Sequence, residues 1–183
     1  MTDRPVLSEE EQRRFTQALL EHLDALHSFA WWLTHRREEI EELVQETCLR
    51  ALRFAHQFQP GTNFKAWLFS ILKHEWFRRT GLARREVQSD PALDDEVFRC
   101  QGGTPEAEVI KSALREDLDA ALRRLPEEYR SAVLLFDLHG FSLKETAEIL
   151  DVPDGTVKSR LSRGRQMLRA SLVAYTESKS REQ

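Results

Sequence analysis

Residues 142–168 read SLKETAEILDVPDGTVKSRLSRGRQML and contain the most informative pattern of the chain. SLKE (142–145) is a capping box that begins a short helix, and DVP (151–153) turns the chain. Gly155-Thr156 then opens a last helix that is expected to run to about Leu172. Two short helices joined by a three- or four-residue turn are typical of a helix-turn-helix.

The last of these helices has two different faces. Apolar or small residues recur every three or four positions and predict an inner face, made of Val157, Leu161, Gly164 and Leu168. The opposite face is polar and basic, with Lys158, Ser159, Ser162, Arg163 and Gln166. A helix fits the major groove of DNA, where Arg or Lys bonds guanine and Ser bonds either kind of base edge. The pattern therefore favours a DNA-reading helix over an ordinary helical hairpin with a solvated basic face.

Charge is unevenly distributed along the chain. The 183 residues include 27 basic and 31 acidic side chains, which gives a net charge of −4. Residues 63–85 nevertheless sum to +5 and residues 154–169 to +4, whereas residues 86–119 sum to −7. Two compact basic patches on predicted helices favour contact with nucleic acid, although solvated helix faces would show the same composition.

The first eighty residues predict three helices that close a small bundle. A capping box at 8–11 begins an apolar stripe that belongs to one helix ending near 34–37. A second stripe spans 40–58, and Pro60-Gly61 breaks the chain after it. Either Thr62 or Asn63 then caps a third helix, since both residue types accept hydrogen bonds from free helix amides.

The remainder of the chain is also predicted to be helical. Periodicity fails between 81 and 104, so this stretch is expected to be a flexible linker. A helix restarts at Thr104-Pro105, another begins at Pro126, and Gly140 ends it. Because no strand pattern longer than a few residues occurs, the predicted fold class is all-α.

Several other classes of protein are excluded. The longest apolar runs, 29–33 and 132–136, hold five residues, whereas a membrane-spanning helix needs about 20. The N-terminal sequence has no signal-peptide pattern, and the lone Cys48 and Cys100 favour a reducing cytoplasm. None of the six histidines forms an H-E-x-x-H motif, and no phosphate-binding loop or nucleophile elbow occurs. We therefore predict a protein that is not an enzyme, inserts into no membrane and binds no metal or cofactor.

Three segments carry a family resemblance: EELVQETCLRAL (41–52), FQPGTNFKAWLFSILKHEW (58–76) and LPEEYRSAVLLFDLHGFSLKETAEILDVPDGTVKSRLSRGRQML (125–168). In these segments the chain resembles the extracytoplasmic function (ECF) sigma factors of bacterial RNA polymerase. GTNFKAWLFSIL and the later REVQ look most like the subgroup that serves the general stress response of alphaproteobacteria.

The resemblance implies two small helical domains and a division of labour between them. The expected ranges are 1–85 for a sigma region 2 bundle, 86–104 for a flexible linker, 105–175 for a region 4 helix-turn-helix domain and 176–183 for a tail. Such a cytoplasmic protein binds core RNA polymerase, recognises the −10 element through region 2 and the −35 element through region 4, and melts DNA. The implied partners are the polymerase β′ clamp helices and β subunit, promoter DNA and an anti-sigma factor.

The resemblance also assigns roles by position. The residues implied to contact core polymerase are Glu42, Gln45, Glu46, Leu49 and Leu52. Those implied to read or melt the −10 element are Thr62, Asn63, Phe64, Lys65, His74 and Arg78, where His74 replaces the asparagine of many relatives. Those implied to bind the −35 element are Thr156, Lys158, Ser159, Arg160, Ser162, Arg163 and Arg165.

Two other classes of function compete with this interpretation. A helix-turn-helix regulator that binds operators without polymerase would normally bring a receiver domain, whose short Val/Ile-rich strands are missing from the first 100 residues. A helical adaptor that only sequesters another protein would not need the basic face of 158–163. Run-off transcription with core polymerase separates these alternatives, because only a sigma factor confers promoter-specific starts.

Overall fold

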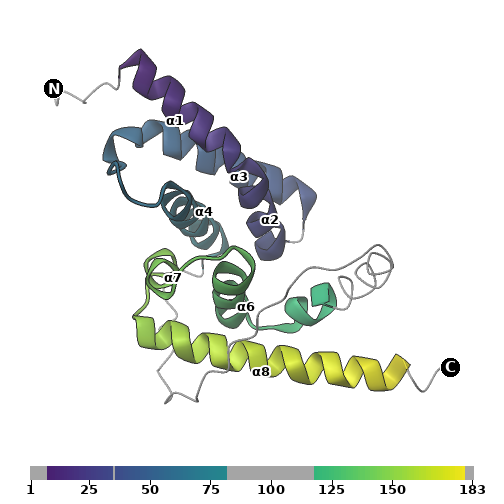
Figure 1. Ribbon diagram of the computed structural model, residues 1–183. Coiled ribbons are helices and arrows are strands. Elements are labelled where there is room, and N and C mark those ends of the chain that lie inside the picture. Colours follow the sequence, from purple (N-terminus) through teal and green to yellow (C-terminus); the bar gives the residue numbers. More distant parts are fainter. Residues whose placement is uncertain (1–7, 35, 82–117, 180–183) are drawn as a thin grey trace, which may run out of the picture. The chain divides into compact units, whose positions relative to one another are not determined.

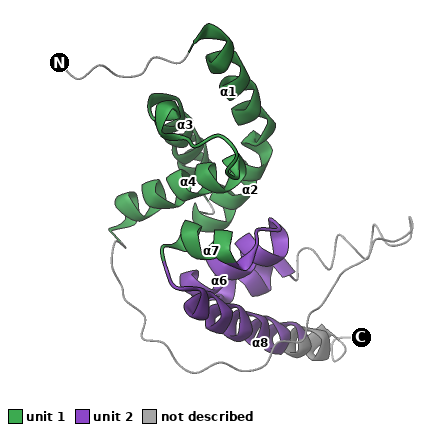
Figure 2. Ribbon diagram, turned by 60° about the vertical axis from the view of Figure 1, so that its left-hand side comes forward, with its two compact units in different colours: residues 1–87, 144–151 green, residues 88–143, 152–183 purple. Residues whose placement is uncertain are grey.

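The computed structural model describes residues 8–34, 36–81 and 118–179, with side chains described up to Leu172. All regular structure in these ranges is helical (Figure 1), which confirms the predicted all-α fold. The predicted linker and the helix start at 104–105 lie outside the described residues. The chain divides into two compact units (Figure 2), of which unit 1 holds 1–87 with 144–151 and unit 2 holds 88–143 with 152–183.

Unit 1 is a helical bundle with a large apolar core. Its first elements are α1 (Glu9–Glu21), α2 (Leu23–Thr34), α3 (Arg37–Arg53), the short η1 (Ala55–Gln57) and α4 (Phe64–Thr80). Leu26 and Phe29 of α2, Leu43 of α3 and Leu68 of α4 are completely buried. Phe29 stacks on Phe69 of α4 with ring centroids 5.1 Å apart, so α2 and α4 are joined through the centre of the core.

The N-terminal helix differs from the sequence prediction in one respect. The capping box is confirmed, because Ser8 Oγ accepts from the Glu11 amide and the Ser8 amide donates to Glu11 Oε2 at 2.8 Å. The apolar stripe, however, belongs to two helices and not to one. The chain breaks at His22, whose amide turns back to the Leu19 carbonyl at 3.1 Å, and a new helix begins at Leu23. Apolar spacing does not reveal the break, because the stripe continues on both sides of it.

The entrance to α4 is set by a turn and a side-chain cap. Gly61 has a φ of +92°, a backbone conformation that residues with a Cβ rarely adopt. Asn63 Oδ1 accepts from the Ala66 amide at 3.2 Å, which identifies Asn63 and not Thr62 as the N-cap. At the other end, Gly81 closes the helix with a φ of +66°. The position and length of this helix are therefore determined locally.

Unit 1 also includes residues 144–151, and therefore all of α7 (Leu143–Leu150) except its first residue. Two residues of the α4 region bond to it. Lys73 Nζ donates to the Leu150 carbonyl at 3.1 Å, and Asn63 Nδ2 donates to Glu145 Oε1 at 2.6 Å. Lys73 is consequently only 5% exposed, and its ammonium lies 3.7 Å from the Phe77 ring centroid.

Unit 2 is built mainly from α6 (Glu127–Val133), η2 (Leu134–Leu138) and α8 (Asp154–Lys179). η2 is a wide π-helical turn, in which the His139 amide bonds to the Leu134 carbonyl five residues earlier. The close approach of α6 and α8 requires Gly164: a Cβ there would lie 2.8 Å from Val133 Cγ2 and 3.3 Å from the Tyr129 carbonyl oxygen. Glycine at this position therefore allows the backbones to pack.

The element order around α7 agrees with the predicted helix-turn-helix. α7 ends at Leu150, residues 151–153 form the turn, and α8 begins at Asp154. Asp151 has a φ of +54°, which Asp tolerates better than most residues with a Cβ. The Thr156 amide bonds back to the Pro153 carbonyl at 2.9 Å, so the turn leads directly into α8. α8 runs beyond the predicted end at Leu172.

Candidate nucleic-acid interface

The residues implied to bind polymerase lie along α3. Leu49 and Leu52 are large apolar side chains that remain 63% and 42% exposed. Glu42 and Gln45 are also exposed, and Glu46 is half-buried. Because they are spaced three or four residues apart, these side chains follow one side of the helix. α3 thus presents apolar and acidic groups together, which suits contact with a basic, partly apolar protein surface.

Charged residues on α3 pair with charged residues of opposite sign near the end of α4. Arg79 Nη1 lies 3.5 Å from Glu42 Oε2, and Arg79 Nη2 donates to the Glu42 carbonyl. Arg50 Nε donates to Glu46 Oε1 at 3.2 Å and lies 2.6 Å from Glu75 Oε1. These contacts place part of the predicted polymerase surface beside part of the basic end of α4.

Glu75 is the residue of this region that sequence reasoning missed. Its side chain is only 2% exposed and pairs with Arg50 and with Arg78, whose Nη2 lies 2.8 Å from Glu75 Oε2. Hydrogen bonding to Glu75 is the main reason why the pKa of Arg78 lies above its usual range. In the sequence Glu75 looks like a single acid in a basic helix. The available signal was its position three residues before Arg78, a spacing that brings opposite charges together.

Two of the predicted −10 residues, Thr62 and Asn63, lie in the loop before α4, and Phe64 begins the helix. Thr62 is exposed, and its Oγ1 donates to the Gln59 carbonyl at 2.8 Å. Phe64 belongs to a cluster of half-buried rings, with its centroid 5.0 Å from Phe15, 5.0 Å from Phe58 and 5.8 Å from Trp67. Phe64 therefore packs against other rings of unit 1, whereas Thr62 remains accessible to solvent.

Two further residues predicted to read the −10 element extend along α4. Lys65 is half-buried, its ammonium lies 5.8 Å from the Phe69 centroid, and burial lowers its pKa. His74 is exposed, and its Nδ1 lies 2.7 Å from the Ser70 carbonyl oxygen. A carbonyl oxygen only accepts, so Nδ1 carries the proton of this bond and Nε2 points elsewhere.

The predicted −35 residues occupy the beginning of α8. Lys158 is exposed, whereas Thr156, Ser162 and Arg163 are half-buried. Ser159 Oγ donates to the Thr156 carbonyl at 2.9 Å, which ties that hydroxyl to its own helix. Arg165 forms a two-pronged ion pair with Asp137 of η2, at 2.8 and 3.2 Å. The exposed charge of this segment is thus concentrated near its N-terminal end.

Arg160 is the most buried of the residues implied to bind the −35 element. It is only 9% exposed, and its Nε has no hydrogen-bond partner among the described residues. Burial lowers its pKa, while Glu128 and Tyr129 of α6 act in the opposite direction. Residue 160 lies three positions after the buried Val157 and four before Gly164, so helical geometry places it on the packed side. Contact of Arg160 with phosphate stays a prediction and would require a different side-chain conformation.

Neither metal sites nor membrane spans occur among the described residues. No group of three or more His, Cys, Asp or Glu side chains there is arranged to hold a metal ion. No described helix is both long and apolar enough to cross a bilayer.

Comparison with known families places both halves of the chain. Residues 19–88 match the model of sigma-70 region 2, and residues 115–168 match the model of sigma-70 region 4. The chain is 37% identical over 155 residues to the ECF RNA polymerase sigma factor EcfG of Rhodopseudomonas palustris, across 84% of this chain and 82% of that relative. It is 38% identical over 161 residues to the ECF RNA polymerase sigma factor SigE of Mycolicibacterium smegmatis, across 85% of this chain but only 60% of that relative.

A solved structure resembles the chain over most of its length. It is the sigma factor RpoE in complex with the anti-sigma factor NepR from Bartonella quintana, which aligns with a TM-score of 0.66 and 32% identity. The alignment covers 87% of this chain and 97% of the solved one. Two helical regions in the same order thus recur in a protein of similar sequence.

Proposed function

Since the chain belongs to the ECF sigma factors of bacterial RNA polymerase, we propose that it binds core polymerase through α3 and promoter DNA through α4 and α8. The observation that carries this proposal is that this chain matches sigma-70 region 2 and region 4 in that order. Most of the residues predicted to make contacts lie on helices α3, α4 and α8. The protein acts as a recognition subunit, and the polymerase supplies the chemistry of RNA synthesis.

Polymerase binding is assigned to the exposed side of α3. Leu49 and Leu52 leave apolar surface in water that a partner would cover, at about 25 cal/mol per Å² of buried apolar area. Glu42, Gln45 and Glu46 add polar contacts around these two anchors. The β′ clamp helices are the proposed surface, and the β subunit is the proposed partner of the second domain.

Recognition of the −10 element is assigned to the loop before α4 and to α4 itself. A protein that melts DNA needs a site for an unstacked base and cations along the separated strand. Thr62 and Asn63 lie at the loop, while His74 and Arg78 lie on exposed parts of α4. Phe64 and Lys65 are half-buried, so their proposed share is to shape the base site.

Recognition of the −35 element is assigned to the first turns of α8. Lys158, Ser159, Ser162 and Arg163 are proposed to face bases in the major groove, and a phosphate is proposed at the free amides near Thr156. Arg160 and Arg165 are proposed to bind phosphates. Arg160 would first leave its buried position, and Arg165 would first leave its ion pair with Asp137. The domain proposed to carry this −35 recognition, region 4, spans residues 105–175.

Regulation by an anti-sigma factor and membership of the general-stress subgroup are also proposed. Support comes from the similarity to EcfG and to a sigma factor solved in complex with the anti-sigma factor NepR. Co-purification from the native host, followed by a binding assay with the recovered protein, tests the partner. A chain that recovers no inhibitor and transcribes constitutively would contradict this part of the proposal.

Run-off transcription with core polymerase tests the function as a whole. We expect promoter-specific transcripts only when the chain is added, and this outcome excludes a regulator that merely binds operators. Arg163→Ala should weaken initiation on a promoter that depends on its −35 element by about 1–3 kcal/mol, because a base contact is lost. Arg123→Ala, which removes an exposed arginine outside the predicted −35 residues, is the control. Unchanged open-complex yield with Arg163→Ala would contradict the −35 assignment.

A further inference from the structure

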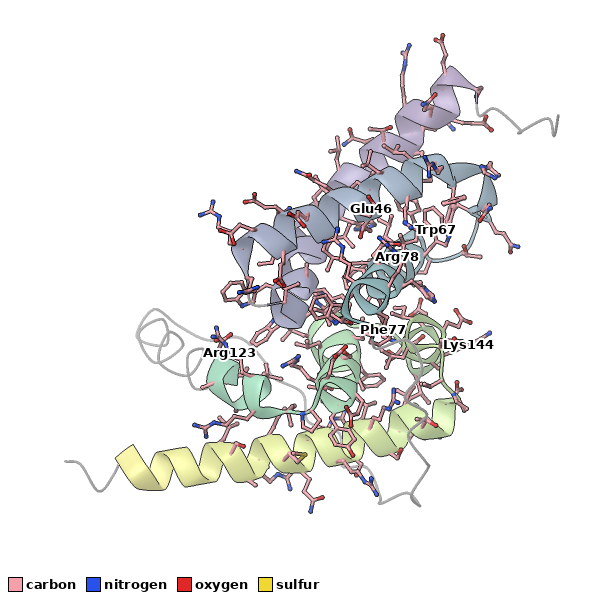
Figure 3. All side chains as sticks on the ribbon, turned by 180° about the vertical axis from the view of Figure 1, so that it is seen from behind. Glu46, Trp67, Phe77, Arg78, Arg123 and Lys144 are labelled. Atoms are coloured by element: carbon pink, nitrogen blue, oxygen red, sulfur yellow. The ribbon has the colours of Figure 1, made fainter. Side chains whose placement is uncertain are left out.

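Four charged side chains form a continuous chain between α3 and α4. In order they are Glu46 and Arg50 from α3, then Glu75 and Arg78 from α4, joined at 3.2, 2.6 and 2.8 Å. Glu46 and Arg78, the two ends, are labelled in Figure 3. The negative charge of Glu46 also contributes to the raised pKa of Arg78, so the ends interact as well.

The ends of this chain have assigned roles, whereas its middle has none. Glu46 is a proposed polymerase contact, and Arg78 is a proposed contact of the −10 strand. Arg50 and Glu75 link them, and Glu75 is the most buried member, with a side chain only 2% exposed against 58% for Arg78. A buried carboxylate is costly unless it is paired, and here each oxygen of Glu75 has its own guanidinium.

Glu75 restricts the conformations of both arginines. A free arginine side chain has many rotamers, and fixing it in one of them costs conformational entropy. Arg78 donates both Nε and Nη2 to Glu75 Oε2, at 3.1 and 2.8 Å, which defines the plane of its guanidinium. Arg50 lies between the two carboxylates, with its single Nε directed at both Glu46 Oε1 and Glu75 Oε1. The contact faces of α3 and α4 are therefore oriented by one shared anion.

We infer that Glu75 is a positioning residue, which fixes Arg78 for the −10 strand and, through Arg50, fixes Glu46 for polymerase. This inference rests on the proposed function, since it needs Glu46 and Arg78 to make those contacts. Glu75 itself touches neither partner. Because one anion orients both ends, the affinities for polymerase and for DNA depend on the same buried group.

Two double-mutant cycles in reconstituted transcription complexes test this inference. The first measures the Kd of the chain for core polymerase, and the second measures the Kd of polymerase saturated with the chain for a −10 fork DNA. Glu75→Gln keeps the size of the side chain but places an amide group against an arginine. We expect it to weaken both affinities about fivefold.

Non-additivity is the decisive readout. Glu75→Gln combined with Arg78→Gln should bind DNA no more weakly than Arg78→Gln alone, and Glu75→Gln combined with Glu46→Gln should bind core polymerase no more weakly than Glu46→Gln alone. The salt dependence of DNA binding should stay unchanged in Glu75→Gln, which retains Arg78, but should become shallower by about one unit in Arg78→Gln. If Glu75 served folding alone, the losses of affinity in the double variants would be the sums of the losses in the single variants.

Matched variants separate the possible failures. Glu10→Gln removes an exposed carboxylate paired with Arg14 on α1, and it should change neither Kd. Glu75→Asp keeps the charge one methylene further back and should show the same non-additivity with smaller losses, even if Glu75→Gln folds poorly. Provided that the wild-type protein gives promoter-specific transcripts, either of two results would overturn this inference alone. These are additive losses of affinity in the double variants, or tighter DNA binding by Glu75→Gln. A wild-type chain without promoter-specific transcripts would overturn the proposed function and this inference with it.

Discussion

The α3–α4 pair of unit 1 and the α6–α8 pair of unit 2 each include a proposed DNA-reading helix, but they hold it differently. α4 is held by large rings and by a buried carboxylate that orients arginines. α8 is held by close packing at Gly164, where an added Cβ would lie 2.8 Å from the Val133 side chain and 3.3 Å from the Tyr129 carbonyl oxygen. The α6–α8 contact therefore leaves no room for added atoms, whereas the position of α4 depends on contacts between side chains. The two helix pairs should respond differently to substitution.

The largest effect is expected from filling the contact between α6 and α8. Gly164→Val should lower the free energy of unfolding of unit 2 by about 3 kcal/mol, because the first added carbon already lies 2.8 Å from Val133 Cγ2. Gly155→Val is the matched control, since nothing lies within 4 Å of a Cβ there. Urea unfolding followed by circular dichroism measures both variants. If the two variants were equally stable, the contact between α6 and α8 would not be as tightly packed as we infer.

A smaller loss is expected when a ring is removed from unit 1. Phe15→Ala deletes a half-buried ring that packs edge-on against Phe64 and Trp67, at 5.0 and 5.9 Å. We expect a destabilisation of about 2 kcal/mol, below the range for fully buried phenylalanine, because the neighbouring rings can close part of the space. Thermal unfolding gives the value, and Phe15→Leu should restore about half of it. A loss as large as that of Gly164→Val would show that this cluster is as rigid as the α6–α8 contact.

The cap of α4 contributes less again. Asn63→Ala removes the acceptor for the Ala66 amide and should cost about 1 kcal/mol, whereas Asn63→Ser should retain most of the cap. Amide hydrogen exchange in the first turn of α4 reports the change directly. If exchange of the Ala66 amide is the same in wild type and Asn63→Ala, the entrance to α4 is set by the Gly61 turn alone.

The smallest effect concerns the capping box of α1 and its dependence on pH. Hydrogen bonds from Ser8 lower the pKa of Glu11 in the folded chain. The stabilisation is therefore present above the ordinary pKa of a glutamate and is lost as the pH falls through the lower folded-state value. Amide exchange at Ser8, followed from pH 6 to pH 3, should show progressive loss of protection. Glu11→Gln should remove this dependence on pH, and a persistent dependence would assign it to another group.

Sequence patterns predicted the helices well because local rules determine them. The Ser8 capping box, the turn after Pro60 and the stop at Gly140 all follow from residue chemistry within a few positions. The break at His22 was missed because an apolar stripe continues unchanged across it. A pattern of spacing reports which side of a helix is buried, but it does not report whether the helix is continuous.

The candidate site was predictable only in part. The exposed leucines of α3 and the basic start of α8 follow from the family resemblance and the helical period. The pairing of Glu75 with Arg50 joins residues 25 positions apart, and only the packing of α3 on α4 reveals it. Arg160, predicted from the resemblance to bind the −35 element, is buried in the same register as Val157, and its contact with DNA stays a prediction. Tertiary packing determines the surroundings of both Glu75 and Arg160.

If His74 meets the −10 strand as proposed, its bond with Ser70 would limit which bases it can contact. With the Nδ1 proton committed to the Ser70 carbonyl, the neutral ring offers only a lone pair at Nε2 to its surroundings. A base edge that meets it must supply a hydrogen, such as the exocyclic amino group of adenine or cytosine. The amide of asparagine, by contrast, donates and accepts at once. With one accepting atom and no donor, this imidazole would therefore select DNA strands that present a hydrogen-bond donor at this position.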